Sequence, residues 1–527
     1  MKVLIPEKFS KDGIAVLEEA GLDVTFKPDT TPEQLLDMIP EYDALIVRSA
    51  TTVTREVIEN AANLKVIGRA GVGVDNIDRD AATERGIIVC NAPLSNIVSA
   101  AEQTMALMLA VARNTARADK SMKEGKWDRS KFTGTELQGK TLGIFGTGHV
   151  GQLVAERAAA FGMNLIGYDP YCPVERAAHY GITLYDDILE VCRRSDVITL
   201  HMPKTPETTG MIGAEQLNAM PEGAIVLNVA RGGLVDLDAL ATALETGHIG
   251  GAGIDVWEHE PVSDSPVHGF DNVVLTPHLG ASTREAQTRA ATQIAEYVIA
   301  GLQGKTVNTV VNAARIPESV MQAVGPYMPI CQKIGELIAQ MATGSISKVK
   351  IKVAGELSKT DPTVLGTAAL AGIVAPSSEV PVNIINAGYL AERRGIEVEV
   401  VTDPLSSVYP SYVQFFAETS KGEIEVGATQ ALGHDEPRII DIMYYSVDFV
   451  IEKNVAIMEY VDGPGRIGKI GTVLGNAGIS VESMQIANNS EKETATVLMN
   501  LDKPIPARIQ EDLKAAVDCK NAWFVEL

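Results

Sequence analysis

The sequence predicts an α/β protein of several domains, and three observations support this class. Short β-branched runs alternate with helical stretches over the first 315 residues, which is typical of parallel sheets covered by helices. Residues 318 to 450 mix strand-like and apolar helical segments, and residues 452 to 527 follow the order β-α-β-β-α-β. A chain of 527 residues is also too long for one hydrophobic core, so about three to four domains are expected.

The overall composition limits the kinds of partner. A net charge of −23 and a pI near 4.8 argue against nucleic acid or an anionic membrane, so a binding site for an anion requires a local basic pocket. The first residues form no signal peptide, and the apolar run at 362–376 is shorter than the roughly 18 residues of a membrane span. We therefore expect a soluble, cytoplasmic protein. The five scattered cysteines form no CxxC pair and are expected to be reduced, and no metal site is expected.

The first 315 residues predict two parallel sheets. Buried-type strands separated by polar helical stretches fit successive βαβ connections. The strands expected in the first sheet cover residues 2–6, 23–28, 44–49, 65–71 and 87–93. The strands expected in the second sheet cover residues 141–145, 164–170, 196–203, 224–232, 250–256 and 272–278. Long helices are expected at 96–115 and 284–304.

The remaining sequence predicts a mixed α/β domain and a ferredoxin-like module. Strands of the mixed domain are expected at 348–355, 395–401, 423–430 and 438–445, beside at least two apolar helices. The C-terminal module is expected to have strands at 454–462, 479–487, 493–502 and 521–527 and helices at 465–478 and 507–517. This order of elements is that of a split βαβ fold.

A dinucleotide-binding fingerprint lies in the second sheet. The motif GTGHVG follows an apolar strand and opens a helix, and Asp169 ends the next strand, 18 residues after the last glycine. This context is that of a Rossmann-type site, in which glycines allow a tight turn and close approach to a pyrophosphate and the acid accepts hydrogen bonds from a ribose. The expected cofactor contacts in the motif are Gly146, Gly148, His149, Val150 and Gly151. Because Asp169 would repel a 2′-phosphate, NAD is favoured over NADP.

Polar residues end three further strands. Arg231, Asp255 and His278 stand at successive strand ends, where ligands bind in open α/β sheets, although each alone would more often have a structural role. The nearby WEHEP segment contains a histidine between two acids. Neighbours in sequence just past a strand tend to point in different directions, so His259 is expected to be a loop residue rather than the catalytic histidine.

The motifs GTGHVGQ, NVARGG, DVWEHEP and TPHLGAST resemble, in this order, the D-isomer-specific 2-hydroxyacid dehydrogenases over residues 1 to about 315. The resemblance implies a Rossmann-type nucleotide-binding domain beside a flavodoxin-like substrate domain. It also implies that Arg231 binds the substrate carboxylate and polarises the reacting oxygen, that His278 is the acid/base and that Glu260 orients it. The residues implied to line the cofactor cleft are Val229, Ala230, Asp255 and Gly280.

The chemistry of these residues agrees with the implied roles. Oxidation of a secondary alcohol removes the hydroxyl proton as hydride leaves carbon, and a neutral imidazole can accept that proton. A carboxylate beside the imidazole stabilises the imidazolium that forms, and an arginine can grip a planar carboxylate with two hydrogen bonds.

A more specific resemblance concerns the substrate. LIVRSAT, VIGRAGVGVDNID and NAPLSNIVSAAE are similar to the branch of this family that oxidises 3-phospho-D-glycerate, the first step of L-serine biosynthesis. It implies that Arg48 and Arg69 hold the substrate's phosphate and carboxylate, with Asn96 close by, which would supply the basic pocket. In KWDRSKF, Arg129 or Lys131 would reach the site of a neighbouring subunit, or would belong to a plain surface turn.

The C-terminal half resembles the long form of this branch, with an intervening domain and an ACT domain. The implied domains are a substrate-binding domain (1–95 and 286–316), an NAD-binding domain (96–285), an intervening, allosteric substrate-binding-like domain (317–450) and an ACT domain (452–527). The resemblance implies a homo-oligomer, a dimer or tetramer, with serine bound between ACT domains. The implied effector contacts are Tyr460, Asp462 and Ser480, the last of which replaces the usual asparagine of the family.

Two other functions stay open at this level. The substrate could be another D-2-hydroxyacid, such as 2-hydroxyglutarate, glycerate or erythronate 4-phosphate. The chain could also be a non-enzymatic NAD-sensing binding protein, because such relatives can retain the same arginine, acid and histidine.

Overall fold

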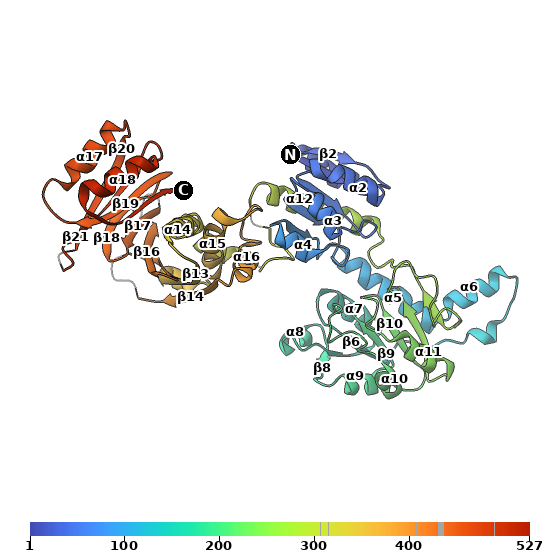
Figure 1. Cartoon of the computed structure of the whole chain (residues 1–527). Coiled ribbons are helices and arrows are strands. Elements are labelled where there is room, and N and C mark those ends of the chain that lie inside the picture. Colours follow the sequence, from blue (N-terminus) through green and yellow to red (C-terminus); the bar gives the residue numbers. More distant parts are fainter. Residues whose placement is uncertain (306, 315, 406–408, 431–436, 490) are drawn as a thin grey trace.

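The computed structural model describes residues 1–527 except 306, 315, 406–408, 431–436 and 490, and it confirms the predicted α/β class (Figure 1). The described residues form four sheets, which we assign to a first, second, third and fourth unit in chain order. Figure 1 shows the third unit between the fourth unit and the first, with the second unit beside the first.

The first unit is a parallel sheet in the order β2-β1-β3-β4-β5, which is the flavodoxin-like order. Hydrophobic cores cover both faces of the sheet, so most strand residues are buried. Its strands are β1 (Lys2–Ile5), β2 (Asp23–Phe26), β3 (Ala44–Val47), β4 (Val66–Arg69) and β5 (Ile88–Asn91). Its helices are α1 (Lys11–Glu19), α2 (Pro32–Met38), η1 (Ile39–Glu41), α3 (Arg55–Asn60) and α4 (Arg79–Glu84).

The second unit is a parallel sheet in the order β12-β11-β10-β9-β6-β7-β8. The strand order reverses between β6 and β9, which creates the switch point where Rossmann-type sheets bind dinucleotides. Its strands are β6 (Thr141–Phe145), β7 (Asn164–Tyr168), β8 (Thr183–Leu184), β9 (Val197–Leu200), β10 (Ala224–Asn228), β11 (Ile249–Ile254) and β12 (Val273–Leu275). Its helices are α5 (Ile97–Ala112), α6 (Thr115–Lys123), η2 (Arg129–Phe132), α7 (His149–Ala160), α8 (Val174–His179), α9 (Ile188–Arg194), α10 (Ala214–Ala219) and α11 (Leu237–Glu245).

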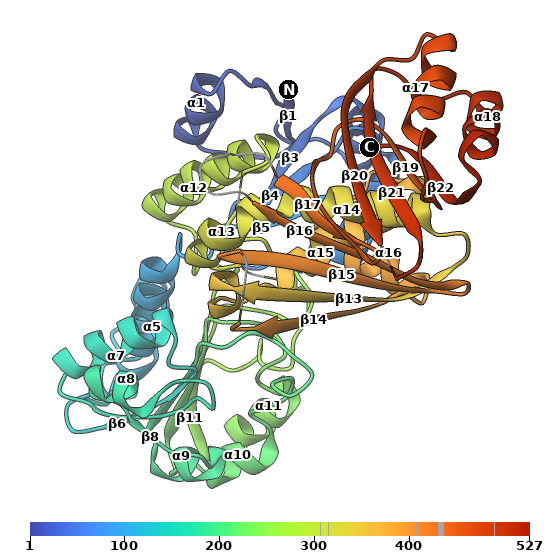
Figure 2. The same cartoon turned by 90° about the vertical axis from the view of Figure 1, so that its left-hand side faces the viewer.

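Two long helices connect these units. Helix α5 leaves the first sheet and packs against α7, β10 and β11, whereas α12 (Arg284–Leu302) returns and packs against α1 and β4. Figure 2 shows α5 at the junction of the two units and α12 beside α1. The segment after β12 therefore packs with the first unit, although the predicted boundaries at 95 and 286 stay a prediction.

The third unit is a mixed sheet in the order β14-β13-β15-β16-β17-β18, with one parallel pair, β13 and β14. Its strands are β13 (Ile346–Gly355), β14 (Glu397–Asp403), β15 (Ser411–Thr419), β16 (Gly422–Gln430), β17 (Pro437–Ile442) and β18 (Tyr445–Val450). Its helices are α13 (Glu318–Val324), η3 (Gly325–Tyr327), α14 (Met328–Met341), η4 (Glu356–Lys359), α15 (Thr363–Val374), η5 (Ala375–Ser377) and α16 (Ala387–Arg393). The strand expected at 438–445 is two strands, because Met443 turns the chain with a positive φ of 54°.

The apolar run at 362–376 forms the buried helix α15, which packs on α14. A Cβ atom on Gly372 would lie 2.0 Å from the Gln332 carbonyl oxygen, and one on Gly335 would lie 2.2 Å from that of Ala369. Glycine at both positions therefore lets the two helix backbones approach closely. Within the described ranges, no helix combines the length and apolar character needed to cross a membrane.

The fourth unit has the predicted β-α-β-β-α-β order, with an antiparallel sheet in the order β20-β21-β19-β22. Its strands are β19 (Asn454–Val461), β20 (Val481–Asn489), β21 (Thr494–Leu501) and β22 (Cys519–Glu526), and its helices are α17 (Arg466–Asn476) and α18 (Ala507–Val517). One face of the sheet packs on these two helices.

The other face of this sheet packs on the third unit. Val455, Ile457 and Leu498 belong to the hydrophobic core formed by α14 and α15. The Trp523 indole N–H donates to the Met341 carbonyl at 3.0 Å. The third and fourth units therefore share a hydrophobic core, so we expect them to move together as one rigid body.

A polar contact joins the third unit to the first. The Asn383 side chain donates to the Gly86 carbonyl at 2.7 Å, and the Tyr389 hydroxyl donates to Glu84 Oε1 at 3.0 Å. Arg55 also donates to both oxygens of Glu84, at 2.7 and 3.3 Å. The hydrogen bond from Arg55, followed by that from Tyr389, holds the pKa of Glu84 below its ordinary value. Glu84 is thus the shared acceptor at this contact.

We predict that Glu84→Ala loosens the contact between the first and third units. The variant removes the acceptor of Tyr389 and Arg55, at a cost of about 1–2 kcal/mol, which corresponds to roughly 5- to 30-fold more frequent opening. Hydrogen exchange of peptides covering α4 and α16 measures this opening. Glu41→Ala, which removes an exposed ion pair of the same unit, is the control, and equal exchange in the two variants would contradict the prediction.

Candidate active site

The candidate site lies where the carboxyl ends of the two parallel sheets meet. Arg231 follows β10 of the second unit, and its Nε lies 3.7 Å from Asp75 Oδ2, in the loop that follows β4 of the first unit. This ion pair shows that the two strand-end loops face each other. Side chains from both units can therefore contact one small ligand.

The glycine motif has the geometry of a phosphate-binding turn. Gly146 has a positive φ of 89°, and a Cβ atom on Gly151 would lie 2.2 Å from the Gly146 carbonyl oxygen. A Cβ atom on Gly148 would meet no protein atom within 4 Å, so the motif is open on that side. The residue before α7 is Gly148, which has no side chain that could accept a hydrogen bond from the first N–H groups of the helix. The N–H groups of His149 and Val150 therefore receive no cap from Gly148. These features fit a bound pyrophosphate.

Asp169 lies at the end of β7 and contacts the same turn. Its Oδ2 accepts hydrogen bonds from the Thr147 N–H at 2.8 Å and the Thr147 hydroxyl at 3.1 Å, and its Oδ1 accepts from the Tyr171 N–H at 3.0 Å. The carboxylate is therefore fixed next to the glycine turn. Its remaining acceptor capacity is available to the hydroxyls of a ribose.

Arg231 is fixed by a compact turn after β10. The Asn228 side chain donates to the Arg231 carbonyl at 2.9 Å and accepts from the Ala230 N–H at 3.1 Å. A Cβ atom on Gly232 would lie 1.9 Å from the Trp257 carbonyl oxygen, so this turn packs directly on the loop that follows β11. Val229, which is buried, and Ala230 lie in the same turn, as expected for residues at the cofactor cleft.

His278 and Glu260 form the predicted pair across 18 residues of sequence. His278 Nδ1 lies 2.8 and 3.0 Å from the two carboxylate oxygens of Glu260, and the Trp257 N–H also donates to Glu260, at 3.1 Å. Because Nδ1 faces the carboxylate, Nε2 is the ring atom that can face a substrate. The side chains of His278 and Glu260 are 44% and 38% exposed, so solvent reaches the pair in this structure.

Asp255 is the structural centre of the loop that carries His278. This fully buried carboxylate accepts the hydroxyl of Thr276 and the N–H groups of Leu279 and Gly280, the latter two at 2.7 and 2.8 Å. His278 has a φ of 55°, an αL conformation that costs an L-residue roughly 1–2 kcal/mol. The bonds to Asp255 offset this cost and fix the imidazole direction.

The other histidines of this region do not join the pair. His259 is exposed, and His268 stacks edge-on against Trp257 with ring centroids 5.5 Å apart. His201, which the sequence did not single out, packs against the glycine turn. A Cβ atom on Gly146 would lie 2.6 Å from the backbone carbonyl oxygen of His201. Burial lowers the pKa of His201 to about 3, so its ring stays neutral, 3.0 Å from Thr199 Oγ1.

Arginines from both units form a local basic cluster. Burial, together with the charges of Arg231 and Arg48, lowers the pKa of Arg69 to about 10, while the charges of Glu7 and Asp75 act in the opposite direction. The buried Nε of Arg69 has no hydrogen-bond partner among the described residues. A buried donor without an acceptor is costly, so the cluster is suited to an anion with several oxygens.

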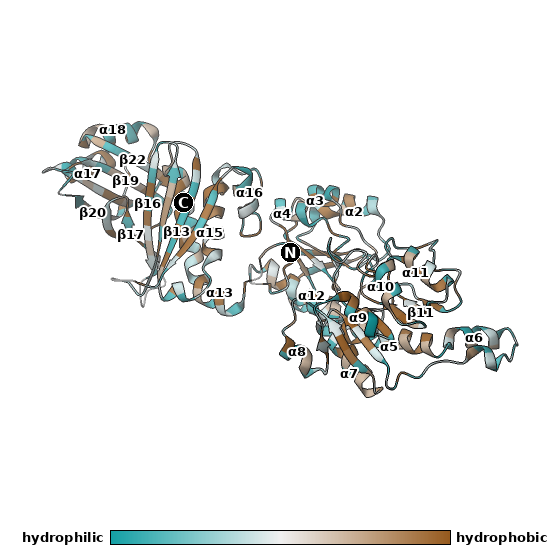
Figure 3. Cartoon of the chain, turned by 90° about the horizontal axis from the view of Figure 1, so that it is seen from below, coloured by the Kyte–Doolittle hydropathy of each residue, from teal (hydrophilic) through white to brown (hydrophobic). Residues whose placement is uncertain are grey.

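The remaining predicted substrate contacts lie in different places. Asn96 is the half-buried residue directly before α5, at the junction of the two units. Arg129 and Lys131 are exposed on the arm formed by α6 and η2, which extends away from the chain body (Figures 1 and 3). The structure brings Arg48, Arg69 and Arg231 together, whereas Arg129 extends away from their cluster.

Two residues that hold the Arg48 loop had no signal in the sequence. Glu7 accepts N–H groups of this loop, and the Asn76 side chain donates to its carbonyls. Asn76 lies within the motif that carries Arg69, but no spacing rule links it to a loop about 25 residues earlier. Only the adjacency of β1, β3 and β4 in the sheet connects these positions.

The three predicted effector residues do not meet within one chain. Tyr460 is 1% exposed, because alternate residues of β19 face α17 and α18. Asp462 follows β19, whereas Ser480 precedes β20, and the register of both strands on β21 places these two residues at opposite ends of the sheet. A common ligand would therefore require a second copy, and all three roles stay predictions.

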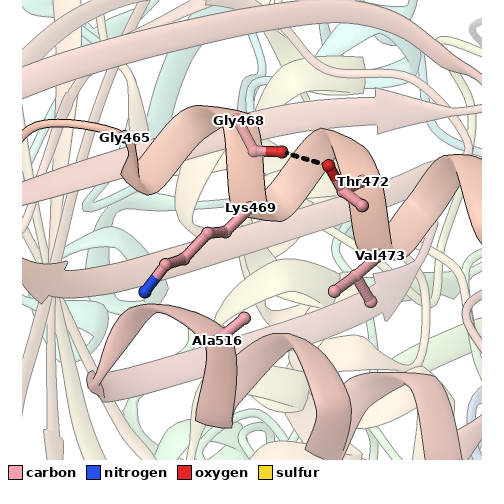
Figure 4. A pocket seen from close by; sticks show the side chains of 6 residues that line it. All are labelled: Gly465, Gly468, Lys469, Thr472, Val473 and Ala516. Carbon is pink, nitrogen blue, oxygen red and sulfur yellow. Dashed lines mark hydrogen bonds between the residues drawn. The ribbon is translucent and has the colours of Figure 1, made fainter.

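Two surface hollows lie in the fourth unit. One of about 350 Å³ is lined by Val461, Asp462, Asn488, Asn489 and Glu493, and Asn488 donates to the Asp462 carboxylate at 3.3 Å. The other, of about 450 Å³, lies between α17 and α18 (Figure 4) and contains none of the predicted effector residues. Only the first hollow therefore overlaps the effector prediction.

Comparison with known proteins agrees with this geometry. Residues 105–280 match the family model of the D-isomer specific 2-hydroxyacid dehydrogenase NAD binding domain, and residues 323–443 match that of the D-3-phosphoglycerate dehydrogenase intervening domain. Together with the glycine fingerprint, the first match shows that NAD is the cofactor.

Relatives match over the whole chain. A D-3-phosphoglycerate dehydrogenase of Methanocaldococcus jannaschii is 44% identical and covers 100% of both chains, and one of Mycobacterium leprae is 42% identical over 100% of this chain and 99% of its own. The crystal structure of a Thermus thermophilus protein, TT0316, matches 59% of this chain and 100% of its own, with 36% identity and a TM-score of 0.54. A D-lactate dehydrogenase from Aquifex aeolicus, complexed with NAD and lactic acid, matches 57% of this chain and 96% of its own at 29% identity and a TM-score of 0.51.

We predict that Asp255→Asn destabilises the second unit by about 2–4 kcal/mol. The amide keeps the shape of the carboxylate but places an NH₂ group against N–H donors in a buried site. Native-state hydrogen exchange of peptides covering residues 249–280 measures the loss. Asp264→Asn, in an exposed loop, is the matched control, and the prediction is wrong if the two variants have the same stability.

Proposed function

Because the chain belongs to the D-3-phosphoglycerate dehydrogenase family, we propose that it oxidises 3-phospho-D-glycerate to 3-phosphohydroxypyruvate, the first step of L-serine biosynthesis. The proposal is carried by the occurrence of the His278–Glu260 pair and of three arginines after strands of the two parallel sheets, whose strand-end loops face each other. This arrangement combines a group that accepts a proton with groups that bind two anionic ends of a small substrate.

The proton is handled by His278. The glycine turn and Asp169 would hold NAD, which would supply the acceptor for the hydride that leaves the substrate carbon. His278 Nε2 takes the hydroxyl proton, and Glu260, on the other side of the ring, stabilises the charge that develops on the imidazole. The reverse reaction uses the same atoms, with imidazolium as the acid.

The arginines divide the recognition of the substrate. Arg231 stands in the same unit as His278 and binds the carboxylate and the reacting oxygen, and Arg48 and Arg69 of the first unit hold the phosphate. The unpartnered Nε of Arg69 supports this assignment, because a phosphate oxygen would supply the acceptor. Asn96, directly before α5 at the junction of the two units, would contribute a further polar contact.

The arginine cluster also favours this substrate over the alternatives. A glycerate or lactate-like acid has one anionic group, which Arg231 alone could bind. Two further arginines, both half-buried, are then without an anion, and burying unpaired cations is unfavourable. A phosphorylated hydroxyacid uses all three.

We also propose that the active protein is a homo-oligomer in the cytoplasm. The arm of α6 and η2 carries exposed Trp127 and Met122 together with Arg129, and exposed large apolar residues of this kind mark contacts with a partner. In a dimer this arm would bring Arg129 towards the neighbouring site. Sedimentation velocity measures the assembly, and a fully active monomer would rule it out.

The fourth unit is proposed to be a serine-binding ACT domain. The hollow beside Asp462 offers a carboxylate and amides, which can bind the ammonium and carboxylate groups of an amino acid. Ser480 would contribute from a second copy. The shared core of the third and fourth units supplies a rigid connection from this site towards Glu84 and the first unit.

We predict that His278→Ala lowers the rate of NADH-dependent reduction of 3-phosphohydroxypyruvate by about 100- to 10,000-fold, because the acid/base is lost. Steady-state kinetics measures the rate, and fluorescence titration checks that the affinity for NADH is retained. His259→Ala is the matched control, since this histidine is a near neighbour of Glu260 but exposed, and it should leave the rate roughly unchanged. Equal rates for the two variants would exclude the assigned role of His278.

We predict that L-serine inhibits the reaction and that Asp462→Ala requires about 10- to 100-fold more serine for the same inhibition, because a charged hydrogen bond is lost. The uninhibited rate should not change. Glu511→Ala, which removes an exposed ion pair on α18, is the control. If serine inhibits the Asp462→Ala variant as strongly as it inhibits the wild type, the effector binds elsewhere.

A further inference from the structure

We infer that Glu7 and Asn76 are positioning residues that clamp the Arg48 loop for recognition of the substrate's phosphate group. The inference rests on the proposed function, in which Arg48 holds that group. Neither Glu7 nor Asn76 has a part in the mechanism described above. Their role follows from how the first sheet brings three strand ends together.

Glu7 closes the loop from one side. It lies two residues after β1, which is adjacent to β3 in the sheet, and it is 9% exposed. Its carboxylate accepts the N–H groups of Arg48, Ala50 and Thr51 at 2.7, 3.2 and 3.1 Å. Three charge-assisted bonds to one loop fold the backbone around the carboxylate.

Asn76 holds the same loop from the other side. Its side-chain amide donates to the backbone carbonyls of Arg48 and Thr51 at 2.8 and 2.6 Å. The backbone carbonyl of Asn76 accepts from the Val53 N–H at 2.8 Å. Glu7 therefore accepts hydrogen bonds from the backbone N–H groups of Arg48 and Thr51, while Asn76 donates to the backbone carbonyls of the same two residues. The backbone of the loop is fixed at both ends.

The clamp determines where the Arg48 guanidinium lies. Its Nη1 donates to the carbonyl of Lys8, the residue after Glu7, at 3.3 Å, and its charge acts on the half-buried Arg69. Two guanidinium groups near each other repel, so a free loop would let Arg48 move into solvent. Holding the loop keeps the two cations together before the anion binds, and such preorganisation favours binding.

Glu7 has a second, opposite influence. Its negative charge lowers the positive potential that attracts a phosphate, since it acts directly on Arg69. If this electrostatic effect dominated, removal of the charge would improve substrate binding. If positioning dominates, removal of the charge weakens binding, so the direction of the change distinguishes the two.

The decisive variant is Glu7→Gln, which keeps the size of the side chain but turns an NH₂ group towards the loop N–H donors. We expect KM for 3-phosphohydroxypyruvate to rise about 10- to 100-fold, with a smaller change in kcat and an unchanged Kd for NADH. Asp43→Asn is the matched control, because Asp43 binds the backbone N–H of Lys2 at 2.8 Å at the opposite, amino edge of the same strands. That variant should affect stability without affecting KM.

A double-mutant cycle separates positioning from general stability. In an Arg48→Ala background, Glu7→Gln should change KM by less than about twofold, because the residue being positioned is already absent. Asn76→Ser should raise KM with Glu7 intact, and it provides the test if Glu7→Gln does not fold. A lower or unchanged KM in Glu7→Gln, or an equal effect with and without Arg48, would overturn the inference. Absence of turnover in wild type would instead refute the proposed function.

Discussion

The site depends on one constraint, the parallel arrangement of the first two sheets. In a parallel sheet all carboxyl ends of the strands lie at one edge, so residues far apart in sequence meet there without any local motif. Helices α5 and α12 connect the two units and bring these edges together, as the contact of Arg231 with Asp75 shows. The proposed acid/base pair comes from one sheet, and two of the three arginines proposed to bind the substrate come from the other. Neither unit alone holds a complete substrate site.

This constraint explains which parts of the site the sequence could predict. The pairing of Glu260 with His278 was implied by the family resemblance, and the hydrogen-bond distances between the two side chains agree with it. Both residues follow strands that are recognisable from their apolar runs, and these strands, β11 and β12, are neighbours in the sheet. Glu7 and Asn76 were missed because their partners are backbone groups of a loop, and every residue carries such groups. A sequence shows side-chain chemistry at strand ends, but it does not show which carboxylate accepts backbone N–H groups after folding.

The same limit applies to the fold. The flavodoxin-like and Rossmann-type sheets were predictable because their strands are buried on both faces and form continuous apolar runs. Strand β15 (Ser411–Thr419) alternates buried and half-buried residues and was not recognised, and the tight turn at Met443 was predicted to be strand. The burial of Tyr460 follows from strand alternation, but which face of β19 meets the helices depends on how the third unit packs on the other face. Long-range packing therefore decided what local patterns left open.

Charge placement then explains how a protein with a net charge of −23 can bind an anion. The carboxylates nearest the reaction centre already have donors: Glu7 takes three backbone N–H groups, Asp255 takes two together with a hydroxyl, and Glu260 faces His278. Each is held by dipoles or by an imidazole rather than by an arginine, so these three carboxylates do not compete with a substrate anion for the guanidinium N–H groups. Asp75, 86% exposed and 3.7 Å from Arg231, is the exception, and at that distance and exposure its ion pair contributes little. A substrate carboxylate can therefore displace Asp75 at small cost, and the negative charge of the rest of the surface is screened beyond about 10 Å in ordinary salt.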